Sequence, residues 1–144
     1  MNNDKLMYTF LNACREGNLE FVRYLLTSFE TKPYIDINSF HPSYYFNGLM
    51  EAFFENKFNI ITYLLTSDDL VETANPFLVN EKGLSFFQLC VQENNYHMIS
   101  FILNKVKTDI NQINYQNLLL LKNKPQYSDA SNYALNLIHM KKYL

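Results

Sequence analysis

Glycine is scarce in this chain of 144 residues, which has only three, and tryptophan is absent. So few glycines argue against the glycine-rich loops that cradle phosphate groups, because such loops need a backbone that approaches its ligand closely. The charges nearly cancel, to a formal net charge of −2, so no excess of lysine and arginine is present to neutralise nucleic-acid phosphates. We therefore expect no phosphate-binding loop and no nucleic-acid partner.

Long apolar runs and secretory features are also missing. No stretch approaches the roughly 20 apolar residues that a membrane-spanning helix needs, and the polar start of the chain does not fit a signal peptide. The only two cysteines, Cys14 and Cys90, fall at equivalent places of a repeated pattern. This placement favours buried, reduced thiols over a disulfide. We expect an intracellular, cytoplasmic protein with no membrane segment.

Residues that could carry out chemistry are dispersed. His41, His97 and His139 have no partners at the spacing of a metal site, and the cysteines form no C-x-x-C motif. Asp68 and Asp69 are the only adjacent acidic pair, and we expect them to begin a loop or a short helix; a helix start, where the helix dipole favours negative charge, suits them better than paired acid/base catalysis. The sequence therefore predicts no metal, no cofactor and no enzymatic activity, although an enzyme with an unrecognised site remains the alternative from another class.

What the chain does have is a recurring apolar pattern. Hydrophobic residues make up 48% of it and charged residues 18%, which is typical of a globular domain. Residues 10–26 read as a short helix, a tight turn and a second helix, and residues 49–65 and 87–103 repeat this pattern. Ala13 and Ala52 are 39 positions apart, and Leu64 and Ile102 are 38 apart. A helix-turn-helix unit that recurs at a fixed spacing indicates a repeat protein.

The third unit resembles an ankyrin repeat most closely. In residues 82–103, Gly83 stands at the turn glycine of that family, residues 85–88 (Ser-Phe-Phe-Gln) stand in place of Thr-Pro-Leu-His, and Asn94-Asn95 replaces the turn between the helices. The resemblance implies an all-α, ankyrin-like solenoid formed by a single domain, residues 1–144. Its repeats would cover about residues 3–35, 36–75 and 76–108, followed by a degraded capping repeat at 109–144.

The spacing is longer than the roughly 33 residues usual for ankyrin repeats. We place the extra residues after the second helices of the first two units, around residues 28–34 and 66–73. In the fourth unit, Pro125 ends the first helix because it lacks an N–H group. A last helix is expected over residues 131–142, with Ser128 or Asp129 as its N-cap.

A solenoid leaves one curved face free for a partner, because each repeat contacts only its neighbours. In the family, the hairpin tips and the exposed sides of the inner helices form this face. The resemblance therefore implies a protein-binding surface that includes Tyr44, Phe46, His41, Arg15, Glu16, Phe54, Glu55, Glu81, Lys82, Gln92 and Tyr115.

Residues 41–46 (His-Pro-Ser-Tyr-Tyr-Phe) place four ring-bearing side chains in a predicted hairpin tip. Tyrosine and phenylalanine give a large contact area with little conformational entropy to lose. We hypothesise that Tyr44 and Phe46 anchor a partner, with Arg15 and Glu55 beside them. The alternative is that these rings fold back onto the helices. It stays open for Tyr44 and is favoured for Tyr45 and Phe46.

The expected function is therefore a protein–protein interaction scaffold, either an adaptor or an inhibitor that masks its target. A microbial effector that acts on host proteins by the same binding mode is an alternative. Self-association through the apolar ends is another, although we expect a monomer.

Overall fold

The computed structural model describes residues 3–106, 110–113 and 115–142. Within these ranges the regular secondary structure is helical, and no strand forms beyond an isolated bridge between Val79 and Ser85. The all-α prediction is therefore confirmed. The α-helices are α1 (Asn3–Glu16), α2 (Leu19–Thr27), α3 (Gly48–Phe54), α4 (Phe58–Thr66), α5 (Phe86–Gln92), α6 (Tyr96–Lys105), α7 (Tyr115–Lys122) and α8 (Ser128–Lys142), and two 3₁₀ turns are η1 (Lys32–Tyr34) and η2 (Ile110–Gln112).

The chain divides into two compact units. The first comprises Met1–Asn75 and Asn80–Lys82 and contains α1 to α4; the second comprises Pro76–Val79 and Gly83–Leu144 and contains α5 to α8. Each unit holds two helix pairs, and residues 80–82, which we assigned to the third repeat, belong to the first unit.

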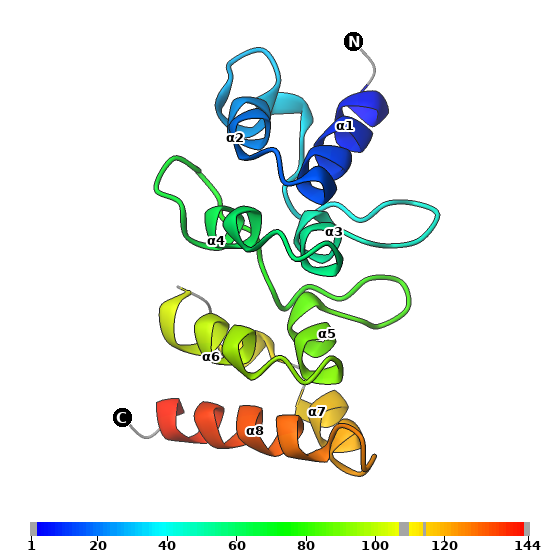
Figure 1. The fold of residues 1–144 in the computed structure, drawn as a ribbon, viewed down its shortest axis with the longest axis vertical. Helices are drawn as coiled ribbons and strands as arrows, with labels where there is room; N and C mark the ends of the chain where they lie inside the picture. Colours follow the sequence, from blue (N-terminus) through cyan, green and yellow to red (C-terminus); the bar gives the residue numbers. More distant parts are fainter. Residues whose placement is uncertain (1–2, 107–109, 114, 143–144) are drawn as a thin grey trace. The chain divides into compact units, whose positions relative to one another are not determined.

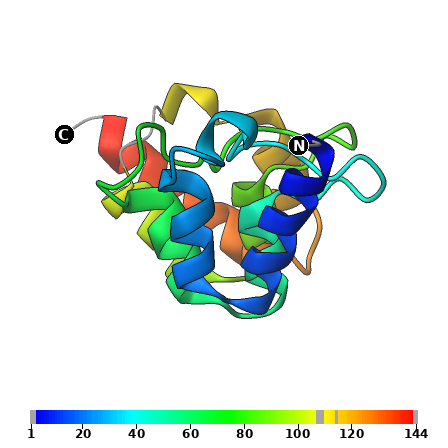
Figure 2. The ribbon, with the colours of Figure 1, turned by 90° about the horizontal axis from the view of Figure 1, so that it is seen from above.

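In the first unit, α1 packs against α2 and α3, and α4 packs against α2 and α3 (Figure 1). Figure 2 shows α1 and α2 from above as two helices joined by a turn at one end. The inner helices α1 and α3 approach closely at Gly48, where an added Cβ would lie 3.1 Å from Cys14 Sγ and 3.1 Å from the Phe10 ring. The core of this unit includes the buried side chains of Phe10, Leu11, Val22, Leu25, Leu49, Met50, Ile60, Ile61 and Leu64.

In the second unit, α5 packs against α6, α7 and α8, and α8 also packs against α6 and α7. α7 ends at Lys122, before Pro125, as expected. α8 begins at Ser128, three residues earlier than the sequence pattern indicates. The described core includes Phe86, Phe87, Leu89, Ile99, Ile102, Leu118, Ala130, Ala134 and Ile138.

The turns inside the first three helix pairs share one backbone geometry. Gly17, Asn56 and Asn94 all adopt left-handed conformations, with φ of 77°, 58° and 55°. Each turn is closed by two main-chain hydrogen bonds, which in the first turn join Gly17 N to Cys14 O (3.3 Å) and Asn18 N to Ala13 O (3.1 Å). This is the Schellman arrangement that ends many helices. The three left-handed residues are 39 and 38 positions apart, which is the spacing that the apolar pattern predicts.

The segments that leave α2 and α4 are also alike. Residues 24–28 and residues 63–67 share the sequence Tyr-Leu-Leu-Thr-Ser, 39 positions apart. Ser28 N donates to Tyr24 O at 2.8 Å, and Ser67 N donates to Tyr63 O at 3.0 Å. Both serines have the same extended backbone, with φ of −70°. The longer loops of the first two units therefore begin with one repeated turn.

The capping box of α5 should make a measurable contribution to stability. Ser85 Oγ accepts a hydrogen bond from Gln88 N at 3.1 Å, and Ser85 N donates to Gln88 Oε1 at 2.9 Å, with both residues buried. Ser85→Ala should lower the free energy of unfolding by about 1–2 kcal/mol, because it leaves a helix N–H without its acceptor. Urea denaturation measures this. Ser43→Ala, at an exposed loop position, serves as the control, and an equal loss in both variants would contradict the assignment.

Candidate binding site

The loop over residues 41–46 is held by its own backbone. His41 N donates to Phe46 O at 2.8 Å, and Tyr45 N donates to His41 O at 2.8 Å. Ser43 N donates to His41 Nδ1 at 3.0 Å, and Tyr45 adopts a left-handed conformation with φ of 63°. These contacts fix the directions in which the ring-bearing side chains leave the loop.

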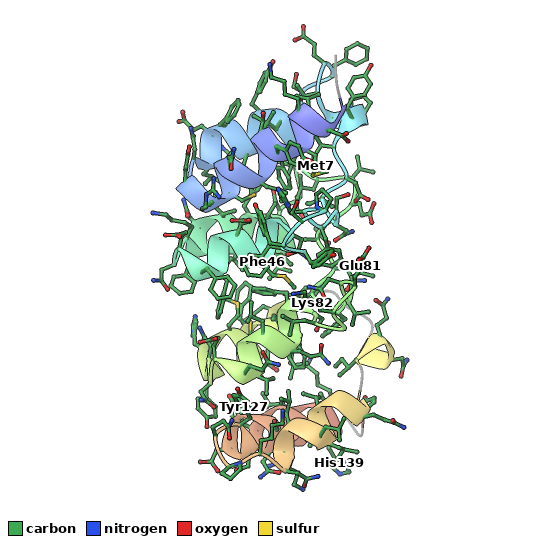
Figure 3. All side chains as sticks on the ribbon, turned by 90° about the vertical axis from the view of Figure 1, so that its right-hand side faces the viewer. Met7, Phe46, Glu81, Lys82, Tyr127 and His139 are labelled. Atoms are coloured by element: carbon green, nitrogen blue, oxygen red, sulfur yellow. The ribbon has the colours of Figure 1, made fainter. Side chains whose placement is uncertain are left out.

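Five rings form a continuous series from α1 across this loop to the end of α3. His41 contacts the Tyr8 ring, with centroids 5.1 Å apart, and stacks on Tyr44 at 3.7 Å. Tyr44 meets Phe46 edge-on at 5.6 Å, and Phe46 stacks on Phe54 at 4.8 Å. We call these residues, Tyr8, His41, Tyr44, Phe46 and Phe54, the aromatic rim. Figure 3 looks onto the side of the first unit on which Phe46 lies.

The aromatic rim leaves much of its ring surface in contact with solvent. Tyr8, Tyr44 and Phe54 are exposed, whereas His41 and Phe46 are half-buried by their neighbours. Phe46 thus folds against α3, as its stacking on Phe54 shows, while Tyr44 keeps 40% of its surface exposed. Tyrosine combines an apolar ring with a polar hydroxyl, a combination that suits a contact surface.

A buried carboxylate lies next to the aromatic rim. Glu51 of α3 is only 4% exposed, and its Oε2 lies 4.0 Å from Nη1 of Arg15, which is also held by Asn12 Oδ1. Glu51 Oε1 is buried without a hydrogen-bond partner in the described part of the chain. A buried carboxylate oxygen without a donor is costly, because it has lost its contact with water and gained nothing in return.

Glu51 influences two neighbouring groups. The pKa of Tyr44 is raised to about 12. The largest cause is partial burial of its hydroxyl, and the hydrogen bond to Glu51 and the negative charge of Glu51 add to it, whereas Arg15 opposes the shift. Burial first, and the Glu51 charge second, raise the pKa of the Cys14 thiol well above its usual range. At neutral pH both groups are therefore protonated, and the Tyr44 hydroxyl keeps its proton to donate.

The titration of Tyr44 should be displaced to high pH. Because its folded pKa is raised above the unfolded value of about 10, its contribution to stability is present below pH 10 and is lost as the pH rises towards 12. Carbon-13 NMR of ring-labelled tyrosine should show one Cζ resonance, absent from Tyr44→Phe, that titrates with a midpoint near 12. A midpoint near 10 for that resonance would mean that Glu51 does not act on this hydroxyl.

An acidic residue outside the predicted set lies beside Arg15. We predicted Arg15 and Glu55 beside Tyr44 and Phe46, and Glu55 caps the exposed C-terminal end of α3, as Glu16 ends α1. The carboxylate that faces Arg15 is Glu51, one turn earlier. The sequence did contain a signal for it: Glu51 interrupts an otherwise apolar helix, Gly48–Phe54, which buries nearly all of its residues.

Two further predicted residues lie in the first unit next to the 41–46 loop. Lys82 Nζ is 5.6 Å from the centroid of the Tyr45 ring, and Asn80 Nδ2 donates to Tyr45 O at 3.0 Å. Glu81 and Lys82 are exposed, and Figure 3 shows them on the same side as Phe46. The segment over residues 80–82 therefore supports the loop and adds one charge of each sign beside it.

The remaining predicted residues, Gln92 and Tyr115, belong to the second unit. Gln92 is the last residue of α5 and is half-buried. Tyr115 begins α7 and lines an open hollow of about 460 Å³ together with α8 residues that include His139. We describe both within that unit and do not assign them to the aromatic rim.

Other kinds of site find no support in the described residues. Over residues 3–106, 110–113 and 115–142, no three histidine, cysteine or acidic side chains are grouped so that they could hold a metal ion. Both cysteines are free and buried. No helix in the part of the chain described is long and apolar enough to cross a membrane.

Comparisons with known proteins leave the chain without a named relative. No family model, no curated protein and no solved structure matches it.

Proposed function

We propose that the chain is a binding module of the ankyrin-repeat kind, an adaptor or an inhibitor, that holds a protein partner on the aromatic rim. Its support is the recurrence of helix pairs, left-handed turns and spacing described above, together with the family-like sequence of the third unit. The single observation that carries the proposal is the continuous series of rings of the aromatic rim, three of them exposed, next to the ion pair of Arg15 and Glu51.

The aromatic rim offers the parts that a protein contact needs. Its rings are held in place before binding, so little side-chain entropy is lost when a partner covers them. Exposed tyrosine and phenylalanine surface supplies apolar area, and Arg15, whose side chain is about half exposed, supplies a cation. Hot spots of this composition commonly contribute 2 kcal/mol or more per residue.

The proposal is tested by affinity capture from the native source, with the full chain immobilised. A protein retained by the wild type should be lost with Tyr44→Ala/Phe54→Ala, with an affinity at least about 30-fold lower. Tyr44→Ala also removes the hydroxyl that is hydrogen-bonded to Glu51, so the affinity is compared at a temperature at which circular dichroism shows both proteins folded. Arg15 is left in place, because its removal would leave the Glu51 charge buried and unpaired.

The matched control is Tyr34→Ala/Leu119→Ala, which removes a tyrosine and a large apolar side chain of similar exposure outside the aromatic rim. This control should retain the partner. Equal retention by the aromatic-rim variant and the wild type would reject the aromatic rim as the binding site.

A further inference from the structure

The outer helix α2 exposes a face whose counterpart on α4 is buried. Phe21 of α2 is 37% exposed, whereas Ile60, 39 positions later on α4, is fully buried. Tyr24 is 47% exposed, whereas its counterpart Tyr63 is only 7% exposed. Since the two helices end in the same five-residue sequence, the difference arises from what covers them.

This face of α4 packs against α2, and Arg23 of α2 makes the polar contact between them. Arg23 Nε lies 3.2 Å from Asp69 Oδ2, and Arg23 Cζ lies 5.3 Å from the centroid of the Tyr63 ring. Tyr63 donates its hydroxyl to the same Asp69 oxygen at 3.5 Å. Asp69 lies in the loop that follows α4, one of the two places expected for it, and not at a helix start. The tyrosine and the aspartate together hold an arginine from the neighbouring helix.

The same tyrosine–acid pair recurs after α2 without an arginine. Tyr24 donates its hydroxyl to Glu30 Oε2 at 3.5 Å, and Glu30 N donates to Ser28 Oγ as Asp69 N does to Ser67 Oγ. Among the described residues, neither Tyr24 nor Glu30 has a cationic partner. Apolar surface surrounds the pair, because Phe21 stacks on Tyr24 and the Phe29 side chain is 88% exposed. We call Phe21, Tyr24, Phe29 and Glu30 the α2 face.

We propose that the α2 face is a second docking surface, which accepts a helix of another protein that carries an arginine. The arginine would lie over Tyr24 and pair with Glu30, as Arg23 does with Tyr63 and Asp69, while Phe21 and Phe29 contact the apolar side of the helix. A second copy of this chain is a poor occupant, since the arginine of its own α2 is already bound to Asp69.

The probe in this experiment is a peptide with the sequence of α2, the helix whose Arg23 pairs with Tyr63 and Asp69 within the chain. A stapled, fluorescent peptide with the sequence of Leu19–Thr27, the helix that covers α4, is titrated into the full-length chain and followed by anisotropy. A second peptide carries Arg23→Gln. The arginine peptide should bind at least about fivefold more tightly, the difference expected from about 1 kcal/mol of cation–π and ion-pair interaction.

Two full-length variants locate the binding. Glu30→Gln and Tyr24→Leu should each remove most of the preference for the arginine peptide, whereas Phe54→Leu on the aromatic rim should leave it unchanged. No binding, equal binding of the two peptides, or a preference that survives Glu30→Gln would overturn the proposal. A dimer of the full chain in analytical ultracentrifugation that Glu30→Gln abolishes would also overturn it, since the occupant would then be a second copy.

Discussion

Phe10→Ala should destabilise the chain by about 3–5 kcal/mol, more than the other substitutions considered. Phe10 is fully buried, and its ring lies against Gly48, where α1 and α3 approach closely. Removing it deletes apolar contact and leaves a cavity that rigid neighbouring helices cannot fill. Urea denaturation followed by circular dichroism should show the midpoint falling sharply, or no folded baseline at all.

Phe29→Ala provides the control for this prediction, because it deletes the same ring from an almost fully exposed position. Its effect should stay within about 0.5 kcal/mol. Comparable losses in the two variants would mean that Phe10 is not part of a packed core between α1 and α3.

Gly48→Val should be the second most damaging change, at about 3 kcal/mol. Gly48 opens α3, and a Cβ alone would already lie within 3.1 Å of Cys14 Sγ and of the Phe10 ring. Two further methyl groups must push α1 away from α3, and overpacking of this kind is as harmful as a cavity. Thermal and urea denaturation of the variant measure the loss.

A double-mutant cycle separates crowding from a general effect of losing glycine. Gly48→Ala should cost less than Gly48→Val, and its cost should shrink by about 0.5–1 kcal/mol when Cys14→Ala makes room. If Cys14→Ala leaves the cost of Gly48→Ala unchanged, the close contact described between the two helices does not limit this position.

The helix pairs were predictable because their signals are local. Apolar spacing marks the helices, and Gly17 and Asn94 mark turns that need a left-handed residue. The start of α8 was missed because Ser128 and Asp129 are polar and give no apolar periodicity, although Ala130, which follows them, is buried. Periodicity reports which face is apolar, not where a helix first forms its hydrogen bonds.

The polar contacts between helices were not predictable in the same way. Arg23 and Asp69 are 46 positions apart, and nothing in either neighbourhood indicates the other. The sequence analysis named Glu55, an exposed acid on α3, whereas the acid that packing places beside Arg15 is Glu51, on the buried side of the same helix. A family register assigns residues to a face, but a rotation of one turn decides which carboxylate meets the arginine.

The aromatic rim was predictable in part. The four ring-bearing residues within 41–46 indicated the loop. Tyr8, which contacts His41, belongs to α1, and its place in the series depends on how the loop lies across that helix. Tyr45, which shares the loop, instead lies under Lys82 in a left-handed conformation. Composition indicated where rings are concentrated, and the backbone decided which of them join into one surface.

The turns that close the helix pairs have a consequence for how such a chain can change over evolutionary time. Because main-chain atoms alone supply the closing bonds, selection at these places acts on a single torsion angle rather than on side-chain chemistry. Glycine and asparagine both occupy these positions in this chain, and the residues around them can change while the turn persists. Lineages descended from one ancestor could in this way retain a common architecture long after their alignments have faded.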